Sequence, residues 1–207
     1  MKALAAVLAA LSALATVAAS EAMRTFDDDP VGSAPPGFTF TVTRQIDSDH
    51  WLVERQNGNG FLTHLLDPTE RRGFAIAVLD GLTSKDLAIA ARLRLSGGIR
   101  EGGLIWRYQD ASNFYMARLD LLDQKLAIDR VFRGNRIRIE GTDDLELDPE
   151  AWHALRVRNE DERIRVYLGG VKVFDIKDRT FRQAGGVGLW ASGESTISFD
   201  DFRVEDE

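Results

Sequence analysis

The sequence of 207 residues contains no cysteine. This absence excludes disulfide bonds, cysteine nucleophiles and thiolate metal sites. The three histidines, His50, His64 and His153, do not have the spacing of a zinc site. The Gly-x-Ser-x-Gly motif is missing, and the glycine clusters do not join a strand to a helix as they do in nucleotide-binding folds. Few of the common catalytic motifs are therefore present.

An excess of positive charge is lacking as well. Lys and Arg together number 26 and Asp and Glu 33, which gives a formal charge of −7 and a pI near 5.1. This balance argues against non-specific binding to nucleic acid or to anionic membranes. Aromatic and basic residues do not interleave as on a nucleic-acid platform. We therefore expect no nucleic-acid partner.

The first 20 residues differ in composition from the rest of the chain. Lys2 supplies a positive start, the run Ala3–Ala19 is almost entirely apolar, and small residues lead up to Ser20. This layout predicts a secretory signal peptide, residues 1–20, cleaved after Ser20. The alternative is a retained membrane anchor, but the run is short for a span and rich in weakly hydrophobic alanine. We expect a secreted or periplasmic bacterial protein with no membrane span, in which residues 21–207 form one domain.

Past this segment the sequence has almost no helical periodicity. Short β-rich runs recur between turn residues, a pattern typical of a β-sandwich or barrel. The chain is therefore predicted to be all-β. The predicted strands are Phe38–Thr43, Trp51–Gln56, Phe61–Leu66, Phe74–Asp80, Leu87–Ser96, Gly103–Tyr108, Asn113–Leu122, Lys125–Arg133, Arg136–Glu140, Trp152–Arg158, Arg163–Leu168, Val171–Ile176, Gly186–Ala191 and Thr196–Glu205.

Two glycine-rich segments predict hairpins. Asn57–Gly60 and Gly169–Gly170 each separate two apolar runs and accept positive φ angles. A third turn is expected at Asn159–Glu162. It would set Leu155 opposite Val166, and Val157 opposite Ile164, on the core face of an antiparallel pair.

The other face of that pair would carry arginines. The same register sets Arg156 against Arg165 and Arg158 against Arg163, with Phe174 beside Arg165 and Tyr167 beside Lys172. Like charges directly opposite one another are unfavourable. Either acidic residues of a neighbouring strand pair with these arginines, whose stems would cover Phe174, or the cluster is a site for an anionic or sugar ligand. Exposed arginines on sheets are commonly just solvated, which favours the first interpretation.

The last strand breaks its alternation. Ile197 and Phe199 share one face, whereas simple counting places Phe202 and Val204 on the other. A β-bulge at Asp200–Asp201 would return all four to the core. Two carboxylates at a bulge could also contribute to a structural calcium site, and the alternative is an edge strand protected by its charges.

Several motifs occur in order along the chain after residue 20. They are Phe26-Asp27, G-G-L-I-W-R-Y-Q-D at 102–110 with N-F-Y at 113–115, W-H with R-V at 152–157, I-R-V-Y-L-G-G at 164–170, G-V-G-L-W at 186–190 and F-D-D-F-R-V at 199–204.

These motifs resemble those of laminin-G-like jelly rolls in the concanavalin A-like lectin/glucanase superfamily. Similar domains occur in exported bacterial proteins, some of them described as family 16 glycoside hydrolase-like or keto-disaccharide hydrolase-like. The resemblance implies a jelly-roll sandwich of two curved antiparallel sheets whose concave face often binds carbohydrate. It does not imply catalysis.

The catalytic strand of family 16 hydrolases is missing. That strand reads Glu-x-Asp-x-x-Glu, and a retaining mechanism needs two carboxyl groups about 5 Å apart. The nearest imitation, Asp144–Asp148, lacks this spacing and runs into Pro149. We assign it no chemistry.

The favoured hypothesis is a non-catalytic module that binds a glycan. Planar side chains with hydrogen-bonding groups are concentrated on one predicted strand pair. Alternation places Leu104, Trp106 and Tyr108 on one face, so some of these aromatics belong to the core, as do Trp152 and Trp190. The candidate ligand-binding residues are Arg107, Tyr108, Asn113, Tyr115, Arg118 and Asp120, and the candidate calcium ligands are Asp200 and Asp201.

Two other functions remain open. The chain could be a structural or protein-interaction domain of the cell envelope, which a large exposed apolar patch would indicate. It could also be a glycoside-processing enzyme that uses Glu101, Asp120 and Asp129. A buried carboxyl pair with one raised pKa would support the enzyme. We expect a monomer with no cofactor other than the calcium ion considered above.

Overall fold

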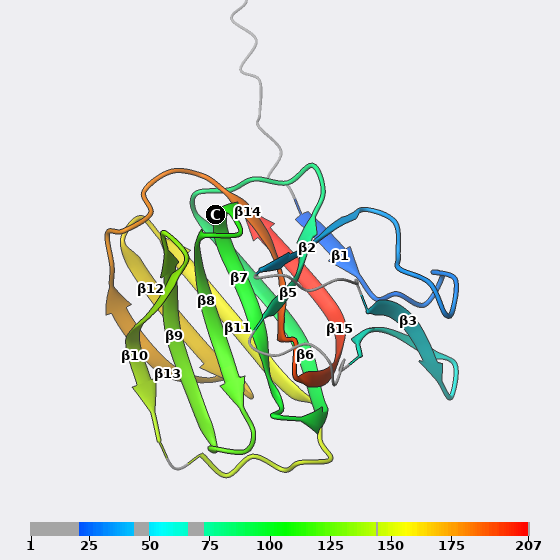
Figure 1. Cartoon of the computed structure of the whole chain (residues 1–207). Coiled ribbons are helices and arrows are strands. Elements are labelled where there is room, and N and C mark those ends of the chain that lie inside the picture. Colours follow the sequence, from blue (N-terminus) through cyan, green and yellow to red (C-terminus); the bar gives the residue numbers. More distant parts are fainter. Residues whose placement is uncertain (1–20, 44–49, 66–72, 144, 207) are drawn as a thin grey trace, which may run out of the picture.

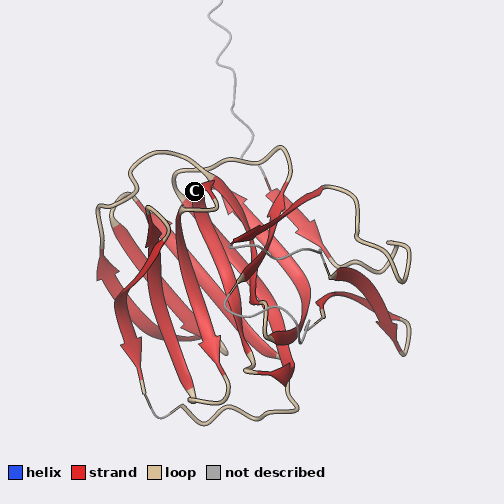
Figure 2. Ribbon diagram, in the orientation of Figure 1, coloured by secondary structure: helices blue, strands red, loops and turns tan. Residues whose placement is uncertain are grey.

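The computed structural model describes residues 21–43, 50–65, 73–143 and 145–206, and within them the chain is all-β (Figure 2). No helix in this part of the chain has the length and apolar character needed to cross a membrane. The strands are β1 (Glu21–Arg24), β2 (Phe38–Thr43), β3 (Trp51–Gln56), β4 (Asn59–His64), β5 (Phe74–Leu79), β6 (Leu87–Gly98), β7 (Glu101–Asp110), β8 (Asn113–Asp120), β9 (Lys125–Phe132), β10 (Asn135–Thr142), β11 (His153–Glu160), β12 (Arg163–Leu168), β13 (Val171–Lys177), β14 (Gly186–Ser192) and β15 (Ser195–Asp206).

The strands form two antiparallel sheets packed face to face. Sheet A has the order β13-β12-β11-β6-β15-β4-β3, with β1 also paired to β15. Sheet B has the order β10-β9-β8-β7-β14-β5-β2. In Figure 1, strands β10, β9 and β8 of sheet B lie in front of β13, β12 and β11 of sheet A. Neighbouring strands are often distant in sequence, as expected of a jelly roll.

Every strand predicted from the sequence is present, with ends displaced by a few residues. Strand β1 was not predicted, and the predicted end of one strand at Leu66 lies outside the described residues. The predicted signal peptide, residues 1–20, also lies outside them. Both glycine hairpins are confirmed, with φ of 55° and 87° at Asn57 and Gly58 and of 57° and 83° at Gly169 and Gly170.

The main core lies between the sheets and follows the two-residue period of the strands. Leu62, Ile89 and Leu189 are fully buried there. Trp106 is also buried in this core, and its indole Nε1 donates a hydrogen bond of 2.8 Å to Asn159 Oδ1. The buried indole N–H of Trp106 therefore has a hydrogen-bond partner.

The outer face of sheet B carries a second apolar cluster. Its fully buried members include Ile105, Met116 and Trp190, and it also contains Ile76, Phe114 and Val131. Trp190 is therefore buried as predicted, but in this second cluster. Sheet B is apolar on both faces over these strands, so its polar side chains there are confined to a few positions.

The predicted bulge in β15 is confirmed. The register with β6 shifts between Asp200 and Arg203, and Asp201 has a φ of 49°. Phe199 and Phe202 on either side of the bulge are both fully buried. The extra residue thus keeps the apolar residues of the strand in the core.

The predicted register of β11 with β12 is wrong by two residues. The turn is Asp161–Glu162, so Leu155 lies opposite Leu168 and Val157 opposite Val166. Asp161 has a φ of 47°, which permits the tighter turn. A shift of two residues preserves the faces, and the predicted core residues remain buried.

The arginine face differs accordingly. In the β11–β12 ladder two arginines, Arg158 and Arg165, lie directly opposite each other. Both form ion pairs with Glu160. Tyr167 lies opposite Lys172 as predicted. Phe174 lies opposite Val166 in the core, because the register shifts between Val166 and Tyr167. Carboxylates accept hydrogen bonds from Arg158, Arg163 and Arg165, so the first interpretation accounts for these three arginines. Arg156 has only a longer ion pair of 3.6 Å, with Glu205.

Two aromatic residues lie on a different face from the one predicted. Trp152 is only half-buried and lies on the outer face of sheet A, an odd number of residues from the core residue Leu155. Arg94 lies over its ring at 4.9 Å. Tyr108 packs against the outer cluster of sheet B because Arg107, with a φ of 46°, lies in a bulge that reverses the alternation.

A buried histidine makes the fold acid-sensitive. His64 is 1% exposed, and its Nδ1 lies 2.9 Å from the Ser195 carbonyl, which can only accept, so Nδ1 carries the proton. Burial is the main reason that the pKa of His64 falls from 6.5 to about 4. The hydrogen bond to Ser195 acts in the opposite direction and favours a higher pKa. Between about pH 6.5 and pH 4, His64 is therefore protonated in the unfolded chain but neutral in the native state.

We expect the native state to lose about 3 kcal/mol through His64 as the pH falls from about 6.5 to about 4. Denaturant titrations at pH 7 and pH 4 measure this loss in the wild type and in His64→Asn, whose amide can still donate to Ser195. The wild type should lose more stability than the variant. Equal losses in the two proteins would contradict the assignment.

Candidate functional site

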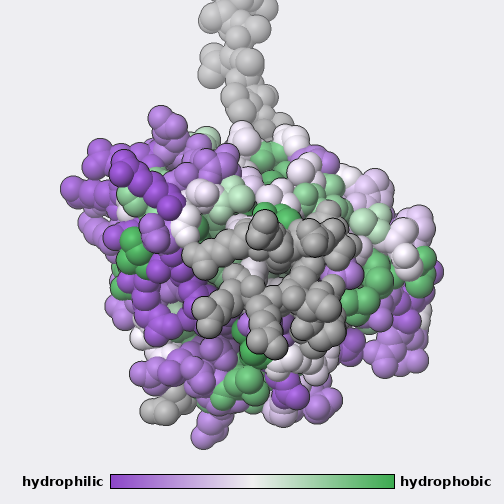
Figure 3. Space-filling model, in the orientation of Figure 1, coloured by the Kyte–Doolittle hydropathy of each residue, from purple (hydrophilic) through white to green (hydrophobic). Residues whose placement is uncertain are grey.

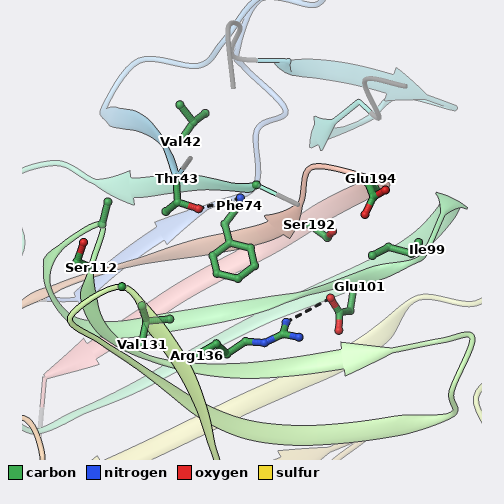
Figure 4. A pocket seen from close by; sticks show the side chains of 13 residues that line it. Val42, Thr43, Phe74, Ile99, Glu101, Ser112, Val131, Arg136, Ser192 and Glu194 are labelled. Atoms are coloured by element: carbon green, nitrogen blue, oxygen red, sulfur yellow. Dashed lines mark hydrogen bonds and ion pairs between the residues drawn. The ribbon is translucent and has the colours of Figure 1, made fainter. Parts of the chain in front are cut away.

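A pocket of about 470 Å³ hollows the outer face of sheet B. Figure 4 shows Phe74 between the side chains of Arg136 and Ser192, with Glu101 beside the Arg136 guanidinium. The residues that line it are Val42, Thr43, Gly73, Phe74, Ile99, Glu101, Ala111, Ser112, Val131, Gly134, Arg136, Ser192 and Glu194.

The lining residues come from strands that are distant in sequence. Glu101 begins β7, Phe74 begins β5, and Arg136 lies near the start of β10. Ser192 ends β14, and Glu194 follows it in the turn to β15. The antiparallel order places the starts of β5 and β7 and the end of β14 at one end of sheet B, and the long side chain of Arg136 reaches them from β10. Figure 3 shows hydrophilic residues gathered over the β8–β10 side of this face.

Phe74 is the aromatic residue of the pocket. Its ring packs edge-on against Trp190, with centroids 5.1 Å apart, and the Arg136 guanidinium lies 5.7 Å from its centroid. The Thr43 hydroxyl accepts a hydrogen bond of 3.0 Å from the Phe74 amide. These contacts fix the ring in place, and a fixed ring loses little entropy when a ligand packs against it.

A buried charge network adjoins the pocket. Arg118, whose side chain is 3% exposed, donates to Glu101 and, through Nε, to Asp129 Oδ2 at 3.1 Å. Its Nη1 also lies 3.3 Å from Asp120 Oδ2. One guanidinium thus holds three carboxylates, which compensates their burial.

Arg136 connects this network to the pocket. Its Nη1 lies 3.5 Å from Glu101 Oε2, the interaction drawn in Figure 4. Burial raises the pKa of Glu101, while the charges of Arg118 and Arg136 oppose the rise. Asp129 Oδ1 has no hydrogen bond within the described residues and faces Arg138 Nε at 3.8 Å.

The six predicted ligand-binding residues do not form one surface. Arg107 is 1% exposed, and its guanidinium donates to the backbone carbonyls of Lys85, Phe181 and Asp161. Tyr115 is fully buried and stacks on Trp106 with centroids 5.5 Å apart. Both residues therefore support the interior.

Tyr115 is held at its hydroxyl as well. Tyr115 Oη donates a hydrogen bond of 2.5 Å to Asp178 Oδ1 and accepts one of 3.1 Å from the Phe181 amide. Burial raises the pKa of Tyr115 to about 12. The phenol therefore remains neutral and bonded at physiological pH.

The other four predicted residues are dispersed. Tyr108 is half-buried and lines a separate groove with Thr39, Thr41 and Thr83. Asn113 caps the turn between β7 and β8 by donating to Asp110 at 3.0 Å. Arg118 and Asp120 lie in the charge network. A direct role in binding for any of the six stays a prediction.

The sequence interpretation did not single out Phe74, Ser112, Arg136, Ser192 or Glu194. One signal was present, the alternation of Arg136 and Arg138 in a strand whose partner carries Asp129. The residues named for the enzyme hypothesis are brought together, since Glu101, Asp120 and Asp129 all contact Arg118.

The two candidate calcium ligands contact an arginine. Arg92 Nη2 lies 2.6 Å from Asp200 Oδ2, and Arg92 Nε lies 2.7 Å from Asp201 Oδ2. Asn59 Nδ2 donates to Asp200 Oδ2 at 3.0 Å. The described residues hold no group of three or more acidic or histidine side chains suited to a metal ion. The donors around these carboxylates thus fit a guanidinium, and calcium stays a prediction.

Replacement of Arg118 by Met should strongly destabilise the fold. It removes the guanidinium that contacts buried Glu101 and Asp129 and the partly buried Asp120, a change that costs about 3–5 kcal/mol. Denaturant titration at pH 7 measures the loss, and Arg136→Met, which removes a more exposed guanidinium, is the matched control. The difference between the variant and the wild type should become smaller at low pH as Glu101, whose pKa is raised by burial, becomes protonated. A loss in Arg118→Met no larger than in the control would contradict this account.

The calcium prediction is tested by melting the protein with calcium and with EDTA. Bound calcium would have to displace Arg92, and EDTA would then lower the melting temperature. An unchanged melting temperature in EDTA, together with a lower one for Arg92→Met, would assign Asp200 and Asp201 to Arg92 alone.

No protein-family model matches the sequence, and a search of curated proteins finds no match. Solved structures are similar. The carbohydrate binding module CBM66 from Bacillus subtilis has a TM-score of 0.65 at 19% identity, covering 82% of this chain and 96% of that one. A β-1,3-1,4-glucanase (lichenase) derived from a mouse hindgut metagenome has a TM-score of 0.58 at 11% identity, covering 90% of this chain and 99% of that one. The xylan β-1,4-xylosidase of Bacillus halodurans C-125 has 0.61 at 16% identity, covering 89% of this chain and 39% of that one. At these identities the likeness concerns the fold alone, a sandwich of two antiparallel β-sheets.

Proposed function

We propose that the chain is a non-catalytic module that binds a glycan in the pocket on the outer face of sheet B. The observation that carries the proposal is the composition of this pocket. An ordered aromatic ring, Phe74, adjoins Glu101, Arg136, Ser112 and Ser192, which offer both donors and acceptors. Sugar rings present apolar C–H faces and a rim of hydroxyl groups, and sites that combine these features fit both.

The charges of the pocket favour a neutral glycan. Among the described residues that line the pocket, Glu101 and Glu194 supply two carboxylates and Arg136 one guanidinium. An acidic sugar would meet both carboxylates and lose its own hydration. A neutral sugar can donate hydroxyl hydrogen bonds to the carboxylates and accept from Arg136.

The similar structures support a glycan-related function. One is named a carbohydrate binding module, and others are named for enzymes that act on glucan or xylan. The same fold carries both activities, so the choice between them depends on the site.

The contacts of Glu101 favour binding over catalysis. Its two carboxylate oxygens face Arg118 and Arg136, which stabilise the ionised form. Asp129 is buried beneath the face, and Asp120 is bonded to Arg118 and to the Asp123 amide. A second candidate function is glycoside hydrolysis, which the raised pKa of Glu101 and the presence of Glu194 in the same pocket favour.

A structural or protein-interaction domain is the remaining alternative. Large apolar side chains that are exposed, such as Met23, Leu122 and Val171, occur on separate strands and turns. Isolated residues of this kind do not indicate a protein interface. We further propose that the domain acts as a secreted or periplasmic monomer.

The test is binding of purified residues 21–207 to an array of neutral glycans that includes β-1,3-1,4-glucan and xylan. We expect saturable binding to one glycan class and a loss of about tenfold in Arg136→Ala, since a hydrogen bond to a charged group contributes about 1.5–3 kcal/mol. Arg138→Ala, two residues along the same strand and outside the pocket, should retain binding.

Three results would contradict the proposal. Folded protein that binds no neutral glycan supports the structural domain. Equal losses in the Arg136 and Arg138 variants place the binding elsewhere. Release of reducing ends from a bound glycan, abolished by Glu101→Gln, supports the enzyme.

A further inference from the structure

A second groove lies on the outer face of sheet A, the face turned away from the pocket just described. It encloses about 500 Å³. Its lining includes the short side chains of Ala90 on the central strand β6 and of Ala154 on β11, and the long side chains of Arg92, Arg156, Arg203, Tyr167 and Met23. Asp201 is the acidic residue of the described lining, and its carboxylate contacts Arg92. A trough forms because alanines stand where the adjacent positions carry long side chains.

Strand pairing places two arginines on either side of Ala90. Arg156 of β11 and Arg203 of β15 each lie opposite Ala90 across their own ladder with β6. Strands in a sheet are about 4.8 Å apart, so the Cα atoms of the two arginines are separated by about 10 Å across the trough. Their side chains are 49% and 45% exposed. Both guanidinium groups are therefore accessible to a ligand.

These two guanidinium groups are poorly satisfied within the protein. They share one carboxylate, Glu205, at 3.6 Å from Arg156 Nη2 and 3.9 Å from Arg203 Nη1. Among the described residues neither has a hydrogen bond to an oxygen atom, and Arg203 Nη2 contacts only the sulfur of Met23, at 3.6 Å. By contrast, Arg163 on the same face forms two bonds of 2.7 and 2.8 Å to Asp175. Planar N–H groups that match an oxyanion are thus left unused beside the trough.

The surrounding face has an excess of positive charge. Glu205 is shared by two arginines, and the same holds for Glu160, which pairs with both Arg158 and Arg165. Asp175 is likewise shared by a lysine and an arginine. Arg92 is the exception, because it contacts both Asp200 and Asp201 and so adds no unpaired positive charge. This excess occurs on a chain whose formal charge is −7. The local potential therefore favours an anion on this face, whatever the overall charge.

We propose that the groove between Arg156 and Arg203 binds the oxyanion groups of an acidic polysaccharide. A carboxylate or sulfate would sit over Ala90 and accept hydrogen bonds from both guanidinium groups. The sugar ring would extend along the groove toward Tyr167 and Arg92. A groove of this volume exceeds the needs of a single small anion. An acidic polysaccharide with one charge per sugar also suits a few spaced arginines better than double-stranded DNA, with one charge per about 1.7 Å of its axis.

The test measures binding of the purified protein to polygalacturonate and to dextran sulfate, with uncharged dextran and single-stranded DNA as comparisons. We expect binding to one or both acidic polysaccharides and none to dextran. Arg156→Gln and Arg203→Gln should each weaken binding about tenfold, as expected for loss of a charged hydrogen bond. Arg182→Gln removes one positive charge from an exposed loop outside the groove and should change the affinity by less than about twofold.

Two further variants separate a built site from general charge attraction. Ala90→Leu fills the floor without changing any charge and should weaken binding as much as the arginine variants. Arg156→Lys keeps the charge but loses the planar fork, so it should recover only part of the affinity. Melting curves of each variant establish that the fold is retained.

Several results would overturn the proposal. Absence of binding to both acidic polysaccharides would do so directly. Equal weakening by Arg156→Gln and Arg182→Gln, or full binding by Ala90→Leu, would show that general charge attraction, and not the groove, accounts for the binding. Equally tight binding of DNA with the same dependence on Arg156 and Arg203 would assign the groove to nucleic acid instead.

Discussion

The burial of one face of the central strands of both sheets is the constraint on which the sandwich depends. A strand places alternate side chains on opposite faces, so an apolar residue of the wrong parity must either be exposed or be rescued by a bulge. The bulge at Asp201 rescues Phe202 and leaves Asp200 and Asp201 together at Arg92. The bulge at Arg107 transfers Tyr108 to the outer cluster of sheet B and leaves Arg107 bonded to three carbonyl groups. The fold thus determines where polar side chains can gather.

Burial on both faces of sheet B restricts charge to places where it can be neutralised. An isolated carboxylate among Ile105, Met116 and Trp190 would be strongly destabilised, because an unpaired buried charge is costly. Arg118 solves this problem by contacting three carboxylates from neighbouring strands. Such a network adds little net stability compared with apolar packing, yet it is strongly destabilising when broken. The same network also holds Glu101 in place at the pocket, so the site and the fold share this arginine.

Local pattern was enough to predict the strands, both glycine hairpins and the β15 bulge, because each follows from alternation and turn chemistry within a few residues. The register of β11 with β12 was not predictable from alternation alone, since a shift of two residues keeps the same faces. In the observed register the buried side-chain amide of Asn159 donates to the Asp161 and Arg163 carbonyls across the turn. It also accepts from Trp106, a contact distant in sequence. Trp152 could have been placed correctly by counting from Leu155. The pocket could not, because Phe74 and Arg136 belong to strands that are distant both in sequence and in sheet order and meet only through the long arginine side chain.

The two outer faces differ because the two sheets solve charge burial differently. On sheet B, carboxylates and guanidinium groups are matched around Arg118 and are largely buried, so the remaining pocket offers directed hydrogen bonds with little net field. On sheet A, exposed arginines outnumber the carboxylates they share, and solvent screening makes such incomplete pairing tolerable. A fully packed apolar core lies between the faces. Substitutions on one face should therefore act independently of those on the other, since distant sites without shared partners have additive effects.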